Sequence, residues 1–116
     1  MYLLVALFGG LGSILRYLLS RLLARIAPEL PFGTLIVNWT GSLLTGVLGG
    51  ALARRIPGVT LAVLVAGLLG GFTTFSSFTY ETMELVQARE LLPAAGNVAL
   101  SLLGGAAFVL LGLRLS

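Results

Sequence analysis

The fold depends on residues 70–81, which read GGFTTFSSFTYE and interrupt an apolar stretch that otherwise has the length and composition of a membrane-spanning helix. Adjacent glycines and β-branched threonines are poor helix formers, because glycine loses backbone entropy and threonine loses rotamer freedom. We therefore predict a helix break near Gly70–Phe75. In hydrocarbon, the freed backbone groups need partners inside the protein or water, so irregular backbone at membrane depth usually lines a cavity or an ion site.

The composition around this stretch is that of an integral membrane protein. The 116 residues are 58% hydrophobic and 9% charged, with a mean hydropathy of +1.08. Because a span needs about 20 apolar residues, the chain has room for about four helices and no separate domain. It contains no cysteine, histidine, aspartate or lysine. A nucleophile, a base and an orienting group cannot be assembled from what remains, so we do not expect an enzyme.

Turn residues and arginines divide the chain into four segments. Prolines follow the first segment, the pair Arg54-Arg55 precedes Pro57-Gly58, and Leu92-Pro93 precedes the last segment. Proline stops or opens helices, and arginine anchors their ends at the interface. The predicted fold is a single all-α transmembrane domain with spans at about 2–23, 32–53, 59–88 with a break, and 94–113.

Polar residues fall at helical spacings within these spans. Asn38, Ser42 and Thr45 share one face of the second span. Asn97 and Ser101 share one face of the fourth span. An asparagine in a span is more often an interhelical hydrogen-bonding group than a ligand.

Beyond the predicted break, Phe75, Phe78 and Glu81 align at spacings of three. An aromatic stripe is ordinarily packing. Here hydroxyl side chains surround it, at Thr73, Thr74, Ser76, Ser77 and Thr79. A polar conduit beside the aromatic residues is therefore as well supported as simple packing.

The net charge of +3 comes from seven arginines and four glutamates. The arginines are distributed along the chain near span ends, which disfavours a nucleic-acid-binding face. Arg16 differs because it follows the first span's glycines within the apolar run, where it could anchor the helix or draw anions towards a vestibule.

The other six arginines divide evenly between the two ends of a four-span bundle. Arg54, Arg55 and Arg114 fall on one side and Arg21, Arg25 and Arg89 on the other. The positive-inside rule then gives almost no preferred orientation. A chain that inserts both ways can pair with its inverted copy, so we expect an antiparallel, dual-topology homodimer.

Three motifs together resemble the Fluc fluoride channels of the CrcB family. They are Gly9-Gly10-x-Gly12-x-x-x-Arg16-Tyr17, Asn38-Trp39-x-Gly41-Ser42 and residues 70–78. They occur in the family's order and cover essentially the whole chain. The resemblance implies a dual-topology homodimer in the cell inner (plasma) membrane, with the lipid bilayer, fluoride and its own inverted copy as partners and no nucleic acid. Such a channel exports cytoplasmic fluoride passively through two pores around a central structural sodium ion.

The resemblance also implies roles for individual residues. The fluoride pore would be lined by Asn38, Phe75, Phe78, Ser76, Ser77, Thr79, Glu81 and Ser101. The backbone carbonyls of Gly70 and Thr73 would hold the sodium ion, and Arg16 would lie in the anion vestibule. Asn97 stands where the family often has tyrosine, and Gly105 where a serine is common.

Two other classes of protein remain as alternatives. A small multidrug-resistance type transporter is also a four-span, dual-topology dimer, but it would be expected to need a carboxylate inside a span. The first two spans have none, and Glu81 lies late in the third. A purely structural subunit would leave the Phe/Ser/Thr cluster of residues 72–79 unexplained.

Overall fold

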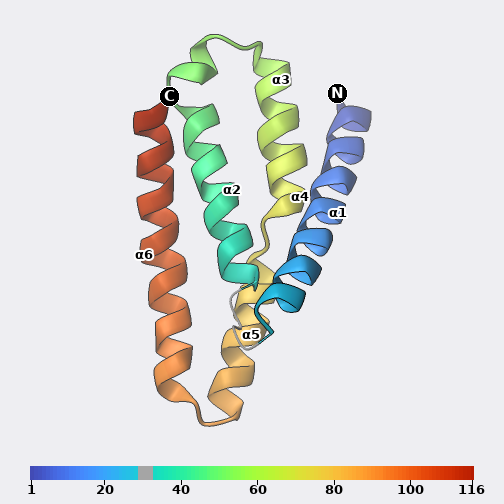
Figure 1. The fold of residues 1–116 in the computed structure, drawn as a ribbon. Coiled ribbons are helices and arrows are strands. Elements are labelled where there is room, and N and C mark those ends of the chain that lie inside the picture. The colour runs from blue at the N-terminus through green and yellow to red at the C-terminus, as the bar shows by residue number, and fades with distance from the viewer. Residues whose placement is uncertain (29–32) are drawn as a thin grey trace.

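The structure is a computed structural model that describes residues 1–28 and 33–116, and these residues form a bundle of helices (Figure 1). The helices are α1 (Tyr2–Ile26), α2 (Gly33–Gly49), the 3₁₀ turn η1 (Ala51–Arg54), α3 (Gly58–Ala62), the π-helical segment η2 (Val63–Leu69), α4 (Gly70–Phe72), α5 (Phe75–Gln87) and α6 (Leu91–Leu115). The chain passes through the bundle four times, so both termini lie at the same end. Elements α3 to α5 form one interrupted passage.

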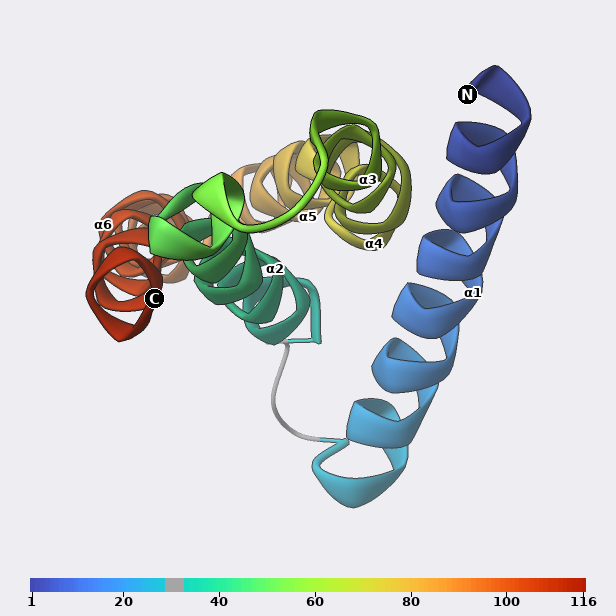
Figure 2. The same ribbon diagram turned by 90° about the horizontal axis from the view of Figure 1, so that it is seen from above.

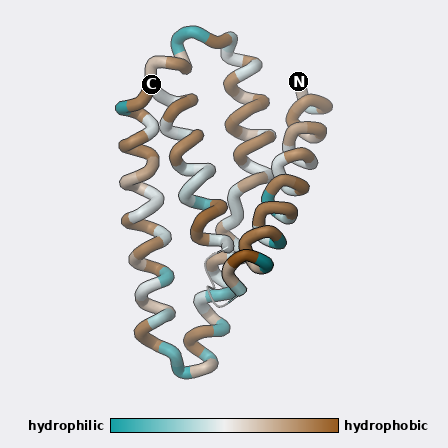
Figure 3. The backbone as a smooth tube through the Cα atoms, viewed as in Figure 1, coloured by the Kyte–Doolittle hydropathy of each residue, from teal (hydrophilic) through white to brown (hydrophobic). Residues whose placement is uncertain are grey.

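Three passages are long and apolar enough to cross a membrane by themselves, namely Tyr2–Ile26, Gly58–Gln87 and Leu91–Leu115. The fourth, α2, has 17 residues, which is at the lower limit for a span. Hydrophilic residues concentrate at the connection between α2 and α3 and at the connection between α5 and α6 (Figure 3). The chain is therefore a membrane protein, and these two hydrophilic connections lie at opposite ends of the bundle.

The interrupted passage lies between α1 and α2, and α6 packs on the far side of α2 (Figures 1 and 2). Glycines bring these helices into close contact. A Cβ on Gly71 would overlap the backbone of Gly9, and a Cβ on Gly112 would overlap the backbone of Leu43 and crowd Val47 in α2. Small residues let helix backbones approach closely where hydrophobicity gives no driving force between helices.

The observed helix ends differ from the predicted ones in three places. The first helix continues to Ile26, and α2 ends at Gly49 and is followed by a 3₁₀ turn, whereas the prediction ran to Ala53. The last helix begins at Leu91 because a proline, here Pro93, is tolerated in the first helical turn. Pro31, one of the prolines after the first segment, and the predicted start of the second span at residue 32 fall outside the described residues.

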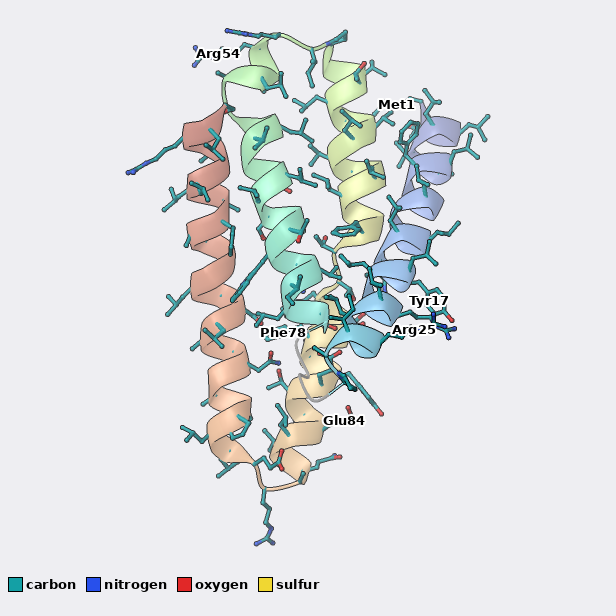
Figure 4. The ribbon with its side chains drawn as sticks, in the orientation of Figure 1. Met1, Tyr17, Arg25, Arg54, Phe78 and Glu84 are labelled. Atoms are coloured by element: carbon teal, nitrogen blue, oxygen red, sulfur yellow. The ribbon has the colours of Figure 1, made fainter. Side chains whose placement is uncertain are left out.

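The predicted break near Gly70–Phe75 is confirmed, and the glycines themselves are helical. Helix continues through Gly70, Gly71 and Phe72, and the extended residues are Thr73 and Thr74. The glycine at 71 serves the contact with Gly9 and is compatible with helix. Two of the arginines lie as predicted: Arg54 at the end of the bundle that carries both termini, and Arg25 near the far end of α1 (Figure 4).

Candidate functional site

The candidate site is built around the two extended residues that separate α4 from α5. Thr73 has φ −85° and ψ 156°, and Thr74 has φ −148° and ψ 120°. In a continuous helix, the Thr74 N–H would donate to the Gly70 carbonyl. Here it donates to Asn38 Oδ1 at 2.9 Å, and Asn38 Nδ2 donates to the Thr74 carbonyl at 2.9 Å. One side-chain amide of α2 therefore pairs with both backbone groups of Thr74.

The end of α4 is satisfied from the opposite side, by α1. Arg16 Nε donates to the Gly71 carbonyl at 3.2 Å, and Ser13 Oγ donates to the same oxygen at 3.4 Å. The last carbonyls of a helix lack intrahelical partners and carry its negative dipole end, so a cation stabilises them. The Arg16 side chain therefore binds the carboxyl end of α4. It also lines the larger cavity described below.

The start of α5 is capped by Thr74, whose Oγ1 accepts a hydrogen bond from the Ser77 N–H at 3.3 Å. The hydroxyls of Ser76 and Ser77 lie 3.3 and 3.2 Å from the same oxygen. Among residues 1–28 and 33–116, the N–H groups of Phe75 and Ser76 donate no hydrogen bond, and the carbonyls of Gly70 and Thr73 accept none. The interruption thus leaves backbone donors and acceptors free, and the Phe72 carbonyl likewise accepts no hydrogen bond within the described residues.

An aromatic pair adjoins these free groups. The rings of Phe75 and Phe78 have centroids 5.6 Å apart and planes inclined by 57°, and Phe75 is 75% exposed on the single chain. Phe75 also borders an open pocket of about 290 Å³. The pocket is lined by Asn38, Ser42, Thr45, Thr73, Thr74, Phe75 and Val109. The predicted polar face of the second span therefore meets the interruption and the first of the two aromatic residues.

A larger cavity of about 1020 Å³ lies on the other side of the interruption, between α1, α2, α5 and α6. Its charged lining consists of Arg16, Glu81, Glu84 and Glu90. Thr34 Oγ1 donates to Glu81 Oε1 at 2.6 Å, which links the start of α2 to the middle of α5. Glu84 lies on the part of α5 beyond the interruption (Figure 4).

Thr74 lines both the small pocket and the large cavity. The structure therefore places Asn38, Phe75 and Thr73 on one side of Thr74, and Arg16, Ser77 and Glu81 on the other side.

Four of the predicted pore residues line neither hollow, although Ser76 and Phe78 adjoin residues that do. Ser76, Phe78, Thr79 and Ser101 line neither. The Thr79 hydroxyl donates to the Phe75 carbonyl at 3.0 Å within α5, and Ser101 is half-buried on α6. Sequence reasoning missed Thr34 and Ser13 as partners of Glu81 and of the Gly71 carbonyl. Hydroxyl residues within spans were the available signal, but their partners depend on how the helices pack.

Comparisons with known proteins show which family the chain resembles. A family model described as "CrcB-like protein, Camphor Resistance (CrcB)" matches residues 3–113. A protein of Novosphingobium aromaticivorans named fluoride-specific ion channel FluC is 44% identical over 115 residues, which cover 96% of this chain and 91% of that protein. Proteins of the same name from Paracoccus denitrificans (44% identical; 97% and 90% covered) and Syntrophotalea carbinolica (39% identical; 97% and 94% covered) are also similar. The chain belongs to the CrcB-like protein family.

Proposed function

We propose that this protein is a passive, fluoride-selective channel that exports cytoplasmic fluoride across the plasma membrane as a homodimer of inverted copies. The similar proteins are named fluoride-specific ion channels. The observation that carries the proposal is the interruption at Thr73–Thr74, which places an aromatic pair beside free backbone donors inside a membrane span. The proposed function involves no catalytic turnover.

The groups at the interruption suit a small anion that must bind and leave. An aromatic ring has a positive edge that attracts an anion more weakly than a full charge does, so Phe75 and Phe78 would bind fluoride without trapping it. Asn38 retains one Nδ2 hydrogen after its bond to Thr74, and the N–H groups of Phe75 and Ser76 are free. These donors would replace part of the hydration shell of fluoride.

Arg16 is the group of the larger cavity that would attract an anion to the far side of Thr74, because the other charged lining residues are three glutamates. Arg16 would favour anions there, while the hydroxyl of Thr34 donates to Glu81 and spreads the negative charge of that carboxylate. The alternative function, a small multidrug-resistance type transporter that would use Glu81, has no support from the family to which the chain belongs.

Assembly with a second copy is supported by the polar groups that the single chain leaves exposed. The pocket that contains Asn38, Ser42 and Thr45 is open to the outside of the single chain, and Phe75 beside it is exposed. Polar side chains and unpaired backbone groups facing hydrocarbon are costly, so a partner must cover them. The balanced arginines make an inverted copy as readily inserted as the first.

The free carbonyls of Gly70 and Thr73 fit a sodium ion. Among the described residues, no group of three His, Cys, Asp or Glu side chains could hold a metal. A hard cation binds oxygen atoms, and a broken helix inside a membrane exposes backbone carbonyls for that purpose. Two copies would contribute two carbonyls each, and the bound ion would fix the two interruptions relative to each other.

The proposal is tested by anion efflux from liposomes, with fluoride and chloride measured side by side by ion-selective electrodes. Phe75→Ala should lower fluoride efflux at least about tenfold, because it removes the exposed ring beside the free donors. Tyr80→Ala is the matched control, since Tyr80 is an exposed aromatic residue of the same helix, 66% accessible. Unchanged fluoride efflux in a folded Phe75→Ala protein would contradict the proposed pathway.

A further inference from the structure

The pairing between Asn38 and Thr74 has the pattern of a β-bridge. In an extended residue, the N–H and the C=O point to the same side, and a neighbouring strand residue exchanges two hydrogen bonds with them. Thr74 is extended, and the Asn38 amide supplies one acceptor and one donor, each at 2.9 Å. The amide therefore substitutes for a strand residue and fixes its own orientation, because its oxygen faces an N–H and its nitrogen faces a carbonyl.

The helix that carries Asn38 is held at the correct distance by its neighbours. A Cβ on Gly41, one turn along, would collide with the Thr73 side chain, so a larger residue there would push α2 away from the interruption. Trp39 holds the other side of α2: its Nε1 donates to the Leu100 carbonyl at 2.9 Å, and a Cβ on Gly104 would overlap its indole ring. The asparagine is thus aimed at Thr74 by a rigid contact on each side.

We infer that Asn38 is a positioning residue that holds Thr74 out of the helix and thereby presents the free donors and carbonyls of the interruption. This inference rests on the proposed channel function. If the Asn38 bonds are lost, the Thr74 N–H can return to the Gly70 carbonyl, which would remove one proposed sodium ligand and turn Phe75 out of its place. Asn38 then affects the selectivity of the channel through the backbone of Thr74. This effect is separate from any contact between an anion and the second Nδ2 hydrogen of Asn38.

The first perturbation changes the side chain. Asn38→Asp keeps the shape and can still accept from the Thr74 N–H, but an ionised carboxylate cannot donate to the Thr74 carbonyl. Gln87→Glu is the matched control for the added charge, because Gln87 is an exposed amide at the end of α5.

The second perturbation leaves Asn38 intact and replaces the Thr74 backbone amide with an ester, which removes its N–H. The matched control is the same replacement at Thr60, whose N–H lies in the first turn of α3 and makes no hydrogen bond within the described residues. Each perturbation of the pair should lower fluoride efflux at least about tenfold, because each leaves a part-buried group unpaired. Each should also lower the ratio of fluoride to chloride efflux, which simple loss of folded protein would not change.

Combining the two changes shows whether Asn38 acts through the Thr74 backbone or independently of it. If Asn38 acts through Thr74, the doubly altered protein is no worse than the more severe single one, since groups that share one interaction are not additive. Additive losses, or normal efflux in the Thr74 ester, would overturn the inference.

Hydrogen exchange keeps the inference testable even if the unmodified protein carries no fluoride, a result that would refute the proposed function alone. The amides of Phe75 and Ser76 should exchange more slowly in Asn38→Asp than in Gln87→Glu, because a helix that re-forms through Thr74 gives them carbonyl partners, and equal rates would overturn the positioning role.

Discussion

Substitution of Gly12 by alanine is the most direct test of how α1 holds the interrupted span. Gly12 is buried where α1 crosses η2 and α4. An added Cβ would lie 2.8 Å from the Phe72 nitrogen and 3.1 Å from the Leu68 carbonyl carbon, and it would overlap the Leu68 oxygen. These are backbone atoms, so no side-chain rotation relieves the overlap and α1 must move outward.

The expected size of this effect follows from comparison with Gly10. A Cβ on Gly10 would meet nothing within 4 Å. Both substitutions gain about 1 kcal/mol of helix propensity, which cancels when the two variants are compared. What remains is the overpacking term for Gly12, about 1–3 kcal/mol. We therefore expect Gly12→Ala to be less stable than Gly10→Ala by that amount.

The free energy of unfolding is measured by titration from mild detergent into dodecyl sulfate, at fixed protein concentration because association contributes to stability. Trp39 is the single tryptophan and packs against Phe108 with ring centroids 5.4 Å apart, so its fluorescence reports unfolding. Equal stability of the two alanine variants would refute the close backbone contact between α1 and the interrupted span.

Two further substitutions test individual backbone contacts. Arg89 ends α5 with φ 60°, and the Glu90 N–H donates to the Leu85 carbonyl at 2.9 Å, so Arg89→Gly should stabilise the protein by about 0.5–1 kcal/mol in the same titration. Arg16→Met removes a charged donor from the Gly71 carbonyl and should destabilise the protein by about 1.5–3 kcal/mol.

Each of these has an arginine control. Arg55→Gly should bring no gain, because Arg55 already has a negative φ of −104°. Arg21→Met should change stability by less than about 0.5 kcal/mol, because its partner is the exposed Tyr17 hydroxyl. A stabilising Arg55→Gly, or a loss in Arg21→Met equal to that in Arg16→Met, would show that the contacts are wrongly assigned.

The sequence predicted the membrane class, the four passages and the region of the break, because these depend on composition and on short-range punctuation by proline, glycine and arginine. The adjacent glycines and the threonines predicted the break near Gly70–Phe75, because both are poor helix formers. Local propensity could not show that Gly71 serves the contact with Gly9. The extended residues Thr73 and Thr74 are stabilised instead by Asn38, which is distant in sequence.

In the candidate site, too, local spacing could be predicted from the sequence but contacts between distant residues could not. Spacing placed Asn38, Ser42 and Thr45 on one face, and all three line the small pocket. The partner of Arg16 could not be predicted, because the Gly71 carbonyl becomes available only where the helix ends. Nor could Arg89 be recognised as a left-handed residue, since that position is usually glycine.

The central claim is that fluoride crosses the membrane through this protein. Its most direct test is efflux from liposomes that contain the unmodified protein, loaded with equal concentrations of fluoride and chloride. Fluoride should leave rapidly while chloride is retained. Retention of fluoride by liposomes that contain folded protein, or equal loss of the two anions, would contradict it.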